Sequence, residues 1–143
     1  MPELRIEIER WPFKEPFRIT GYTITDAELI LVTLAADGHV GRGEAAGVFY
    51  RRETPESMIR EIESVRGVIE AGITRQKLRA LLQAGGARNA LDCALWDLEA
   101  QKAGRPAFRL AGLDDLKPLA TTCTIGADTP EEMARRARDF GPR

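Results

Sequence analysis

The stretch from Asn89 to Pro106, "NALDCALWDLEAQKAGRP", decides the fold of this chain. Its apolar residues recur at the spacing of an α-helix with one broad buried face, and they are Ala90, Leu91, Ala94, Leu95 and Leu98. A glycine at position 104 followed by Pro106 is typical of a helix C-terminus, because proline cannot continue the helix. The stretch therefore predicts a core helix that ends at Gly104.

The acidic residues of this helix raise the question of whether it is catalytic. Asp92 and Glu99 lie roughly 10 Å apart along the axis, too far for two short carboxylates to share one divalent ion. Asp92 and Asp97 lie about 140° apart around the axis and face different ways. Arg88 precedes Asp92 by one turn and Lys102 follows Glu99 by three residues, so local ion pairs are available. A structural role is favoured, with a catalytic role as the alternative.

The residues before this helix predict an antiparallel sheet. "ELRIEIERW", residues 3–11, alternates apolar and charged residues like a strand with one wet face. Two prolines and a glycine in residues 12–25 favour a long connecting loop. Residues 27–36 are apolar on both alternating faces and predict a central strand covered on both sides. Asp37-Gly38 predicts a type I′ turn into a third strand, "HVGRGEA".

Capping residues predict the helices that follow. Thr54-Pro55-Glu56 has the hydroxyl, proline and acid expected at a helix N-terminus, and an apolar stripe continues to about Gly72. The stripe consists of Ile59, Ile62, Val65 and Ile69. Thr74 is predicted to cap a shorter helix through Gln83, which Gly85-Gly86 interrupts. A short helical turn, "AFRLAG", is expected after the core helix.

The last part of the chain predicts one strand and one helix. "LATTCTIG", residues 119–126, is predicted to be a strand, and Thr129-Pro130 begins a capped helix that runs to about Phe140. The fold class is therefore α+β. A strand followed by a helix is half of a parallel crossover, and its partner strand is missing, so the chain is expected to stop within a fold.

Composition excludes several classes of partner. The 143 residues carry 22 acidic and 21 basic side chains, so the net charge of -1 gives no electrostatic case for nucleic acid. No leader and no apolar run of roughly 20 residues is present, so we expect a cytoplasmic protein without membrane contact. Cys93 and Cys123 form no metal-type cluster and predict buried thiols in a reducing compartment. The single histidine, His39, follows a predicted turn and is not a catalytic candidate.

Three stretches resemble a known family. "ARNALDCALWDLEAQKAGRPAFRLAG", residues 87–112, resembles a signature of the mandelate racemase and muconate lactonizing branch of the enolase superfamily. "GRGEAAGVFYRRETPESM", residues 41–58, and "TTCTIGADTPEEM", residues 121–133, resemble the dipeptide epimerases of that branch. The resemblance implies an N-terminal capping domain over residues 1–116 and the first strand and helix of an incomplete (β/α)8 barrel over residues 117–143.

The resemblance also implies a reaction. Members of the branch remove the proton α to a carboxylate and hold the enediolate with Mg²⁺, using lysines and carboxylates at the ends of barrel strands. Those residues would lie beyond Arg143, so we expect no catalytic or metal-binding residue in this chain and no activity from it alone. The implied partners are a small-molecule substrate, which is a dipeptide or an N-acyl amino acid, and further copies of the chain in a homo-oligomer.

The same resemblance supplies the candidate substrate-binding residues. In the family the cap lends two loops to the mouth of the active site, here residues 17–25 and 46–53. The candidates are Arg18, Ile19, Ile24, Phe49, Tyr50 and Thr124. Ile24 stands where epimerases for Ala-Glu often hold an arginine, which favours an apolar second residue, with Arg18 as a substitute cation. Thr124 matches a substrate-facing threonine, although a β-branched residue suits a strand equally well. Glu44 resembles a structural acid of the family.

Two alternatives stay open. The cap motifs are shared across the branch, so a muconate-lactonizing-type or acyl-succinate-forming enzyme is the alternative within the enzyme class. Outside that class, the chain is a stand-alone cap that acts as a binding or assembly module through its incomplete barrel edge.

Overall fold

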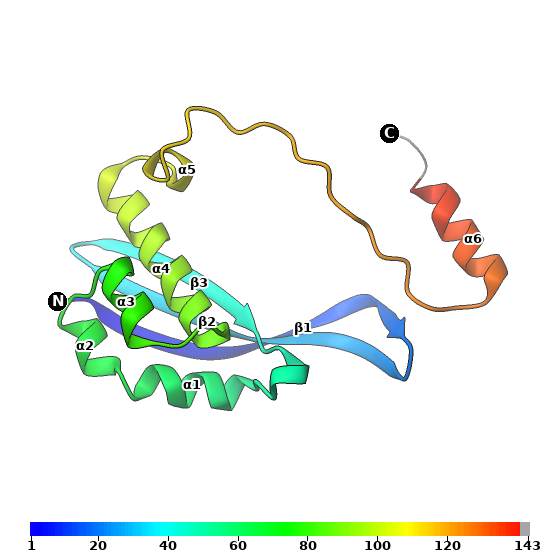
Figure 1. Ribbon diagram of the computed structural model, residues 1–143, viewed down its shortest axis with the longest axis horizontal. Coiled ribbons are helices and arrows are strands. Elements are labelled where there is room, and N and C mark those ends of the chain that lie inside the picture. The colour runs from blue at the N-terminus through cyan, green and yellow to red at the C-terminus, as the bar shows by residue number, and fades with distance from the viewer. Residues whose placement is uncertain (141–143) are drawn as a thin grey trace. The chain divides into compact units, whose positions relative to one another are not determined.

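The computed structural model describes residues 1–140 (Figure 1). The chain divides into two compact units. We call the first the cap unit, which consists of Met1–Arg10 and Glu28–Leu116. The second, which we call the tip unit, consists of Trp11–Ala27 and the segment that begins at Lys117. Among residues 1–140 no helix is long and apolar enough to cross a membrane.

The sheet has three strands in the order of the chain: β1 (Glu3–Ile19), β2 (Tyr22–Ala36) and β3 (His39–Ala46). β2 and β3 are antiparallel, and Ala36 pairs with His39 across the turn. Asp37 and Gly38 both have positive φ angles, 54° and 77°, as a type I′ turn requires. The predicted turn and third strand are therefore confirmed.

The predicted loop over residues 12–25 is wrong. β1 and β2 continue through both prolines and meet at a turn made by Thr20 and Gly21, where Gly21 has a φ of 81°. β1 lies at the edge of the sheet. Proline is tolerated there because an edge strand leaves some of its main-chain N–H positions without a strand partner. The sequence pattern does not reveal which strand is the edge, and without that information two prolines indicate a break in the strand.

The predicted core helix is confirmed as α4 (Gly86–Ala103), which packs on β3 (Figure 1). All five residues of its predicted apolar face are buried. The contact is close because β3 carries glycines there: a Cβ at Gly41 would overlap the main chain at Ala94, and a Cβ at Gly43 would overlap the carbonyl of Ala90. Gly104 ends the helix with a left-handed φ of 58°.

The apolar core lies between one face of the sheet and the helices. Ile30, Val32 and Leu34 on β2 have no exposed surface. Residues 31, 33 and 35 of the opposite face are only half-buried, so the prediction that both faces of this strand are covered holds for one face. The helices contribute further buried side chains, which are Met58, Ile62, Ile69, Leu78 and Leu91.

The helix predicted from Thr54 to about Gly72 is divided into α1 (Pro55–Glu63) and α2 (Arg66–Glu70). Thr54 caps α1 as predicted, in a reciprocal box with Ser57. The break follows Ser64, whose hydroxyl donates to the carbonyl of Glu61 at 2.7 Å and so competes with helical hydrogen bonding. A 3-10 turn, η1 (Phe49–Arg51), precedes α1.

The remaining predicted helices of the cap unit are present. Thr74 caps α3 (Arg75–Leu81) through the main-chain N–H of Lys77, and the helix ends before the predicted Gln83. The short helix after Gly104 is α5 (Ala107–Leu110). The end of α3 differs from the predicted end by two residues. A difference of this size at a helix end leaves the predicted order of elements intact.

Helix side chains occupy main-chain groups at both edges of the sheet. On β1, the N–H of Leu4 donates to Glu70 at 3.4 Å and its carbonyl accepts from Arg66 at 2.7 Å. On β3, the N–H of Arg42 donates to the carboxylate of Asp97 at 2.8 Å. The side chain of Asn89 donates to the carbonyl of Glu44 at 3.4 Å. At these positions the edges are therefore satisfied within the chain and do not offer unpaired groups to another strand.

In the tip unit, Thr129 caps the predicted helix, α6 (Pro130–Asp139), through the N–H of Glu132. The strand predicted over residues 119–126 is wrong, because this segment is extended but pairs with no strand among residues 1–140. A parallel strand needs hydrogen-bonded neighbours on the same sheet. Its residue pattern alone does not supply them.

Candidate functional site

Two of the three acids of α4 have structural partners. Asp97 accepts from the edge of β3, and Glu99 pairs with Arg75 of α3 at 3.0 Å. The Arg75 guanidinium also stacks on Trp96, 3.4 Å from the ring centre. The local partners anticipated from the sequence differ: Lys102 pairs with Asp37 at 2.7 Å instead of Glu99. Tertiary packing places side chains from other elements closer to these charged groups than the residues one turn away on the same helix.

Arg88 likewise donates to the carbonyl of Leu82 at 3.4 Å and not to Asp92. Among residues 1–140 no group of three histidine, cysteine, aspartate or glutamate side chains could hold a metal ion. Cys93 and Cys123 are both free, as predicted, but both are exposed, so the prediction of buried thiols is wrong. Cys93 lies on α4 outside its apolar stripe, and Cys123 lies in the extended segment before α6.

The candidate functional site lies in the tip unit, where the β1–β2 turn meets the start of the C-terminal segment. The N–H of Ala127 donates to the carbonyl of Arg18 at 2.7 Å. Gly126 is buried beside this hydrogen bond, and a Cβ there would lie only 3.2 Å from both the nitrogen and the oxygen of Arg18. Glycine thus permits the close approach of the two main chains.

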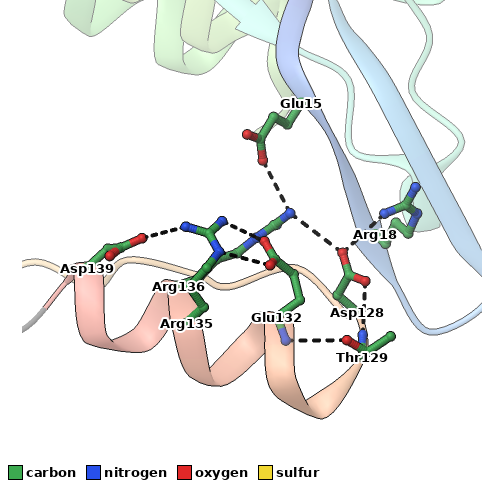
Figure 2. A network of polar contacts seen from close by, with 8 residues as sticks. All are labelled: Glu15, Arg18, Asp128, Thr129, Glu132, Arg135, Arg136 and Asp139. Atoms are coloured by element: carbon green, nitrogen blue, oxygen red, sulfur yellow. Dashed lines mark hydrogen bonds and ion pairs between the residues drawn. The ribbon is translucent and has the colours of Figure 1, made fainter.

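Charged side chains from the same segments form a network of polar contacts, which Figure 2 shows. Arg136 of α6 pairs with Glu15 at 3.2 Å, with Asp128 at 3.5 Å and with Glu132 at 2.9 Å. Asp128 also accepts from the Arg18 guanidinium at 3.4 Å. The site is therefore held by alternating positive and negative groups from β1, the segment before α6, and α6 itself.

The pKa values of this network follow its hydrogen bonds. Hydrogen bonds from Arg135 and then from Arg136 lower the pKa of Glu132 to about 2. The hydrogen bond to Glu132, followed by the charges of Glu15 and Asp128, raises the pKa of Arg136. The Glu132 carboxylate is thus held ionised well into the acidic range.

A pocket of about 330 Å³ opens beside the network. It is lined by Glu15, Pro16, Phe17, Thr124, Ile125, Gly126, Arg135, Arg136, Asp139 and Phe140. Its wall thus combines two aromatic rings with both signs of charge and the hydroxyl of Thr124. Such a wall suits a small molecule with an apolar part and a polar part.

The structure brings together some of the predicted substrate-binding residues. Arg18, Ile19, Ile24 and Thr124 all lie in the tip unit. Ile19 and Ile24 stand on either side of the Thr20–Gly21 turn, each 38% exposed. The guanidinium of Arg18 is engaged with Asp128. Whether any of these residues binds substrate stays a prediction.

The other two candidates lie in the cap unit. Phe49 and Tyr50 form the start of η1. Tyr50 is 75% exposed.

Sequence reasoning missed Glu15, Gly126, Asp128 and Arg136. Gly126 ends the predicted strand, and Asp128 precedes a predicted cap, so each had a sufficient local explanation. Arg136 is one of several charged residues on the helix predicted from Thr129 to about Phe140, and nothing in the sequence distinguishes it from the others. A signal was available in the "GAD" that follows "TCTI", because a glycine before a capping segment often permits close main-chain approach. The partner of this segment lies on β1, in residues for which the sequence predicts a loop.

Residues 1–112 match the family model of the mandelate racemase / muconate lactonizing enzyme N-terminal domain. The chain belongs to this family. Within the family it is 36% identical over 137 residues to the L-Ala-D/L-Glu epimerase of Escherichia coli K12, covering 96% of the chain and 43% of that protein. The chain therefore spans less than half the length of this family member.

Solved structures in the family agree with the fold. An enolase family member from Agrobacterium tumefaciens, with homology to dipeptide epimerases and bound sodium and L-Ala-L-Glu, superposes with a TM-score of 0.90 at 34% identity. The match covers 97% of this chain and 43% of that one. A dipeptide epimerase of Enterococcus faecalis, complexed with Mg and L-Leu-L-Tyr, has a TM-score of 0.81 at 29% identity, covering 95% and 41%.

Proposed function

We propose that this chain serves as the N-terminal part of a magnesium-dependent epimerase that inverts an α-carbon of a dipeptide. The family match and the likeness to two dipeptide-bound relatives support this. In the proposal, residues 1–116 form the capping domain and residues 117–143 begin a (β/α)8 barrel. The barrel supplies the acid, the base and the metal ligands, and the cap covers the substrate.

The metal belongs to the proposal for the whole enzyme and not to this chain. A relative from Enterococcus faecalis was solved with Mg. Residues 1–140 do not fit a magnesium site, because they offer no group of three suitable side chains. We therefore assign no metal-dependent step to them, and their proposed task is to bind and enclose the substrate.

The observation that carries the proposed specificity is the chemistry of the β1–β2 turn. It presents Ile19 and Ile24 as exposed apolar side chains. Its cation, Arg18, already pairs with Asp128 at 3.4 Å and is less available to a substrate carboxylate. We infer that the second residue of the dipeptide is apolar or that the substrate is an N-acyl amino acid. Phe49, Tyr50 and the hydroxyl of Thr124 are the other proposed contributors.

A dipeptide screen tests this function. The protein expressed from its gene would be incubated with Mg²⁺ and a dipeptide library in deuterated water, with α-proton exchange followed by mass spectrometry. We expect exchange to be faster with apolar second residues than with L-Ala-L-Glu. Ile24→Arg should shift the preference toward Ala-Glu, while Ile24→Leu, the matched control, should not. Absence of exchange on every dipeptide would remove the epimerase assignment.

The family description names muconate lactonizing enzymes, so a muconate-lactonizing-type or acyl-succinate-forming enzyme is the second candidate. Turnover of a lactone or acyl-succinate precursor without dipeptide exchange would favour it. We further propose a cytoplasmic homo-oligomer without nucleic-acid or membrane partners. The net charge of -1 and the two free cysteines support this setting.

A further inference from the structure

Carboxylates from three places in the tip unit converge on one guanidinium. Arg136 contacts Glu15 of β1, Asp128 of the preceding segment and Glu132 of its own helix, all within 3.5 Å. Its side chain is only 23% exposed, whereas that of Glu15 is 63% exposed. Without the guanidinium, the negative charges of these three carboxylates would be less well neutralised, and like charges at this range repel.

The neighbouring arginine provides the contrast. Arg135 pairs with Glu132 at 2.6 Å and with Asp139 at 2.9 Å, and both partners are on α6 itself. Figure 2 shows the guanidinium of Arg136 reaching away from the helix toward Glu15. An arginine that only stabilised its helix would need partners like those of Arg135. The contacts of Arg136 also join α6 to β1.

The same joint fixes the main chain next to the predicted substrate residues. The N–H of Ala127 bonds to the carbonyl of Arg18. Arg18 precedes Ile19, and Ala127 follows Thr124 by three residues. A planar guanidinium holds several carboxylate oxygens in set directions, unlike the point charge of a lysine. Arg136 is therefore placed to set the distance between the β1–β2 turn and the segment that carries Thr124.

We propose that Arg136 is a positioning residue, which bridges Glu15 and Asp128 and thereby holds the β1–β2 turn at the segment 124–128 in the geometry that binds the substrate. The proposal rests on the proposed function for its consequence in catalysis. It adds a residue outside the predicted binding set as a determinant of substrate affinity. The side chain itself has no role in the chemical step.

Amide hydrogen exchange in the 143-residue chain tests the structural half of the proposal without any substrate. Arg136→Met should speed exchange of the Ala127 N–H about fivefold, because the hydrogen bond to Arg18 opens more often. Arg135→Met is the matched control and should change the same rate by less than about twofold. Arg136→Lys should give an intermediate rate, because lysine keeps the positive charge but lacks the planar guanidinium that bonds several carboxylate oxygens at once.

Steady-state kinetics of the magnesium-loaded enzyme tests the catalytic half. With the dipeptide that the parent enzyme turns over best, Arg136→Met should raise KM about fivefold and leave kcat within about twofold. Arg138→Met, a change on the same helix at an exposed arginine that does not line the pocket, should leave both constants near the parent values. A fall in kcat with unchanged KM would overturn the positioning role, because the residue would then act in the chemical step.

Glu15→Gln keeps the test decisive if Arg136→Met unfolds α6, which circular dichroism would reveal. It removes the β1 partner and leaves the pairs within α6 intact, so it should still speed Ala127 exchange and raise KM. Equal Ala127 protection in the parent, Arg136→Met and Glu15→Gln would overturn the proposal. Equal sensitivity to Arg135→Met would also overturn it. If the parent enzyme catalysed no α-proton exchange on any dipeptide, only the proposed function would be refuted. The positioning role of Arg136 would still be tested, because amide hydrogen exchange of Ala127 needs no turnover.

Discussion

The cap unit and the tip unit differ in what holds them together. Every buried apolar side chain that the structure describes lies in the cap unit. Within residues 11–27 and 117–140 the only buried residue is a glycine, Gly126, and ion pairs and one main-chain hydrogen bond join the C-terminal segment to the β1–β2 hairpin. Apolar burial is not weakened by electrostatic screening and involves no titrating group, whereas exposed ion pairs weaken with added salt and depend on pH. The two units should therefore respond to different perturbations.

The largest effect should come from deleting a core side chain of the cap unit. Leu91 of α4 has no exposed surface, so Leu91→Ala should lower the free energy of unfolding by about 3 kcal/mol. The matched control is Leu119→Ala in the tip unit, where the side chain is 88% exposed and the change should stay within about 0.5 kcal/mol. Urea unfolding followed by circular dichroism measures both. Equal losses would contradict the contrast between the units.

The next effect tests the contact between β3 and α4. Gly43→Ala adds a Cβ that would overlap the Ala90 carbonyl, and it should cost about 2 kcal/mol. Gly67 of α2 has no atom within 4 Å of an added Cβ. Gly67→Ala should therefore stabilise the chain by about 0.5 kcal/mol, because alanine is the better helix former. Thermal unfolding midpoints that move in the same direction for both variants would argue against the close packing.

A smaller effect should separate the acids of α4. Asp97→Ala leaves the N–H of Arg42 without its acceptor and should cost about 1 kcal/mol. The side chain of Asp92 has no hydrogen bond or ion pair to another residue within 1–140, so Asp92→Ala should stay within about 0.5 kcal/mol. Urea unfolding compares the two. If Asp92→Ala were the costlier change, the edge contact of Asp97 would not be the reason for an acid on this helix.

The smallest effect should appear in the tip unit on acidification. The pKa of Glu132 is lowered from 4.5 to about 2, so the ionised, hydrogen-bonded form persists above 4.5 and is lost as the pH falls toward 2. Carbon-detected NMR of the Glu132 carboxyl should show a midpoint near 2, and raised salt should move it upward. Glu132→Gln is the control that removes this titration. A midpoint near 4.5 would mean that the arginines do not engage the carboxylate in solution.

Local patterns predicted those elements whose stabilising partners are nearby in sequence. The Asp37-Gly38 turn, the Thr54, Thr74 and Thr129 caps, and the glycine end of α4 each depend on a few adjacent residues. The apolar face of α4 followed from its spacing alone. These features survive because local hydrogen bonding and tertiary packing favour the same conformation.

The failures share the opposite property. Pro12 and Pro16 are compatible with β1 only because that strand is an edge, and edge position is a property of the whole sheet. The segment 119–126 has a strand-like composition, but strand pairing needs partners that its own residues cannot specify. The Glu15 to Arg136 ion pair joins residues near opposite ends of the chain, so no spacing rule reveals it.

The Thr20–Gly21 turn constrains how this part of the protein can change in length. Successive side chains of a strand point to opposite faces, and a tight turn fixes which residues lie opposite one another. Inserting one residue into β1 near Ile19 would exchange its two faces and turn Phe17 away from Gly126, which it now approaches. Inserting two residues would keep each side chain of β1 on its present face of the sheet. Selectivity at this turn should therefore diversify by side-chain replacement or by paired insertions, and single-residue insertions should be the costly route.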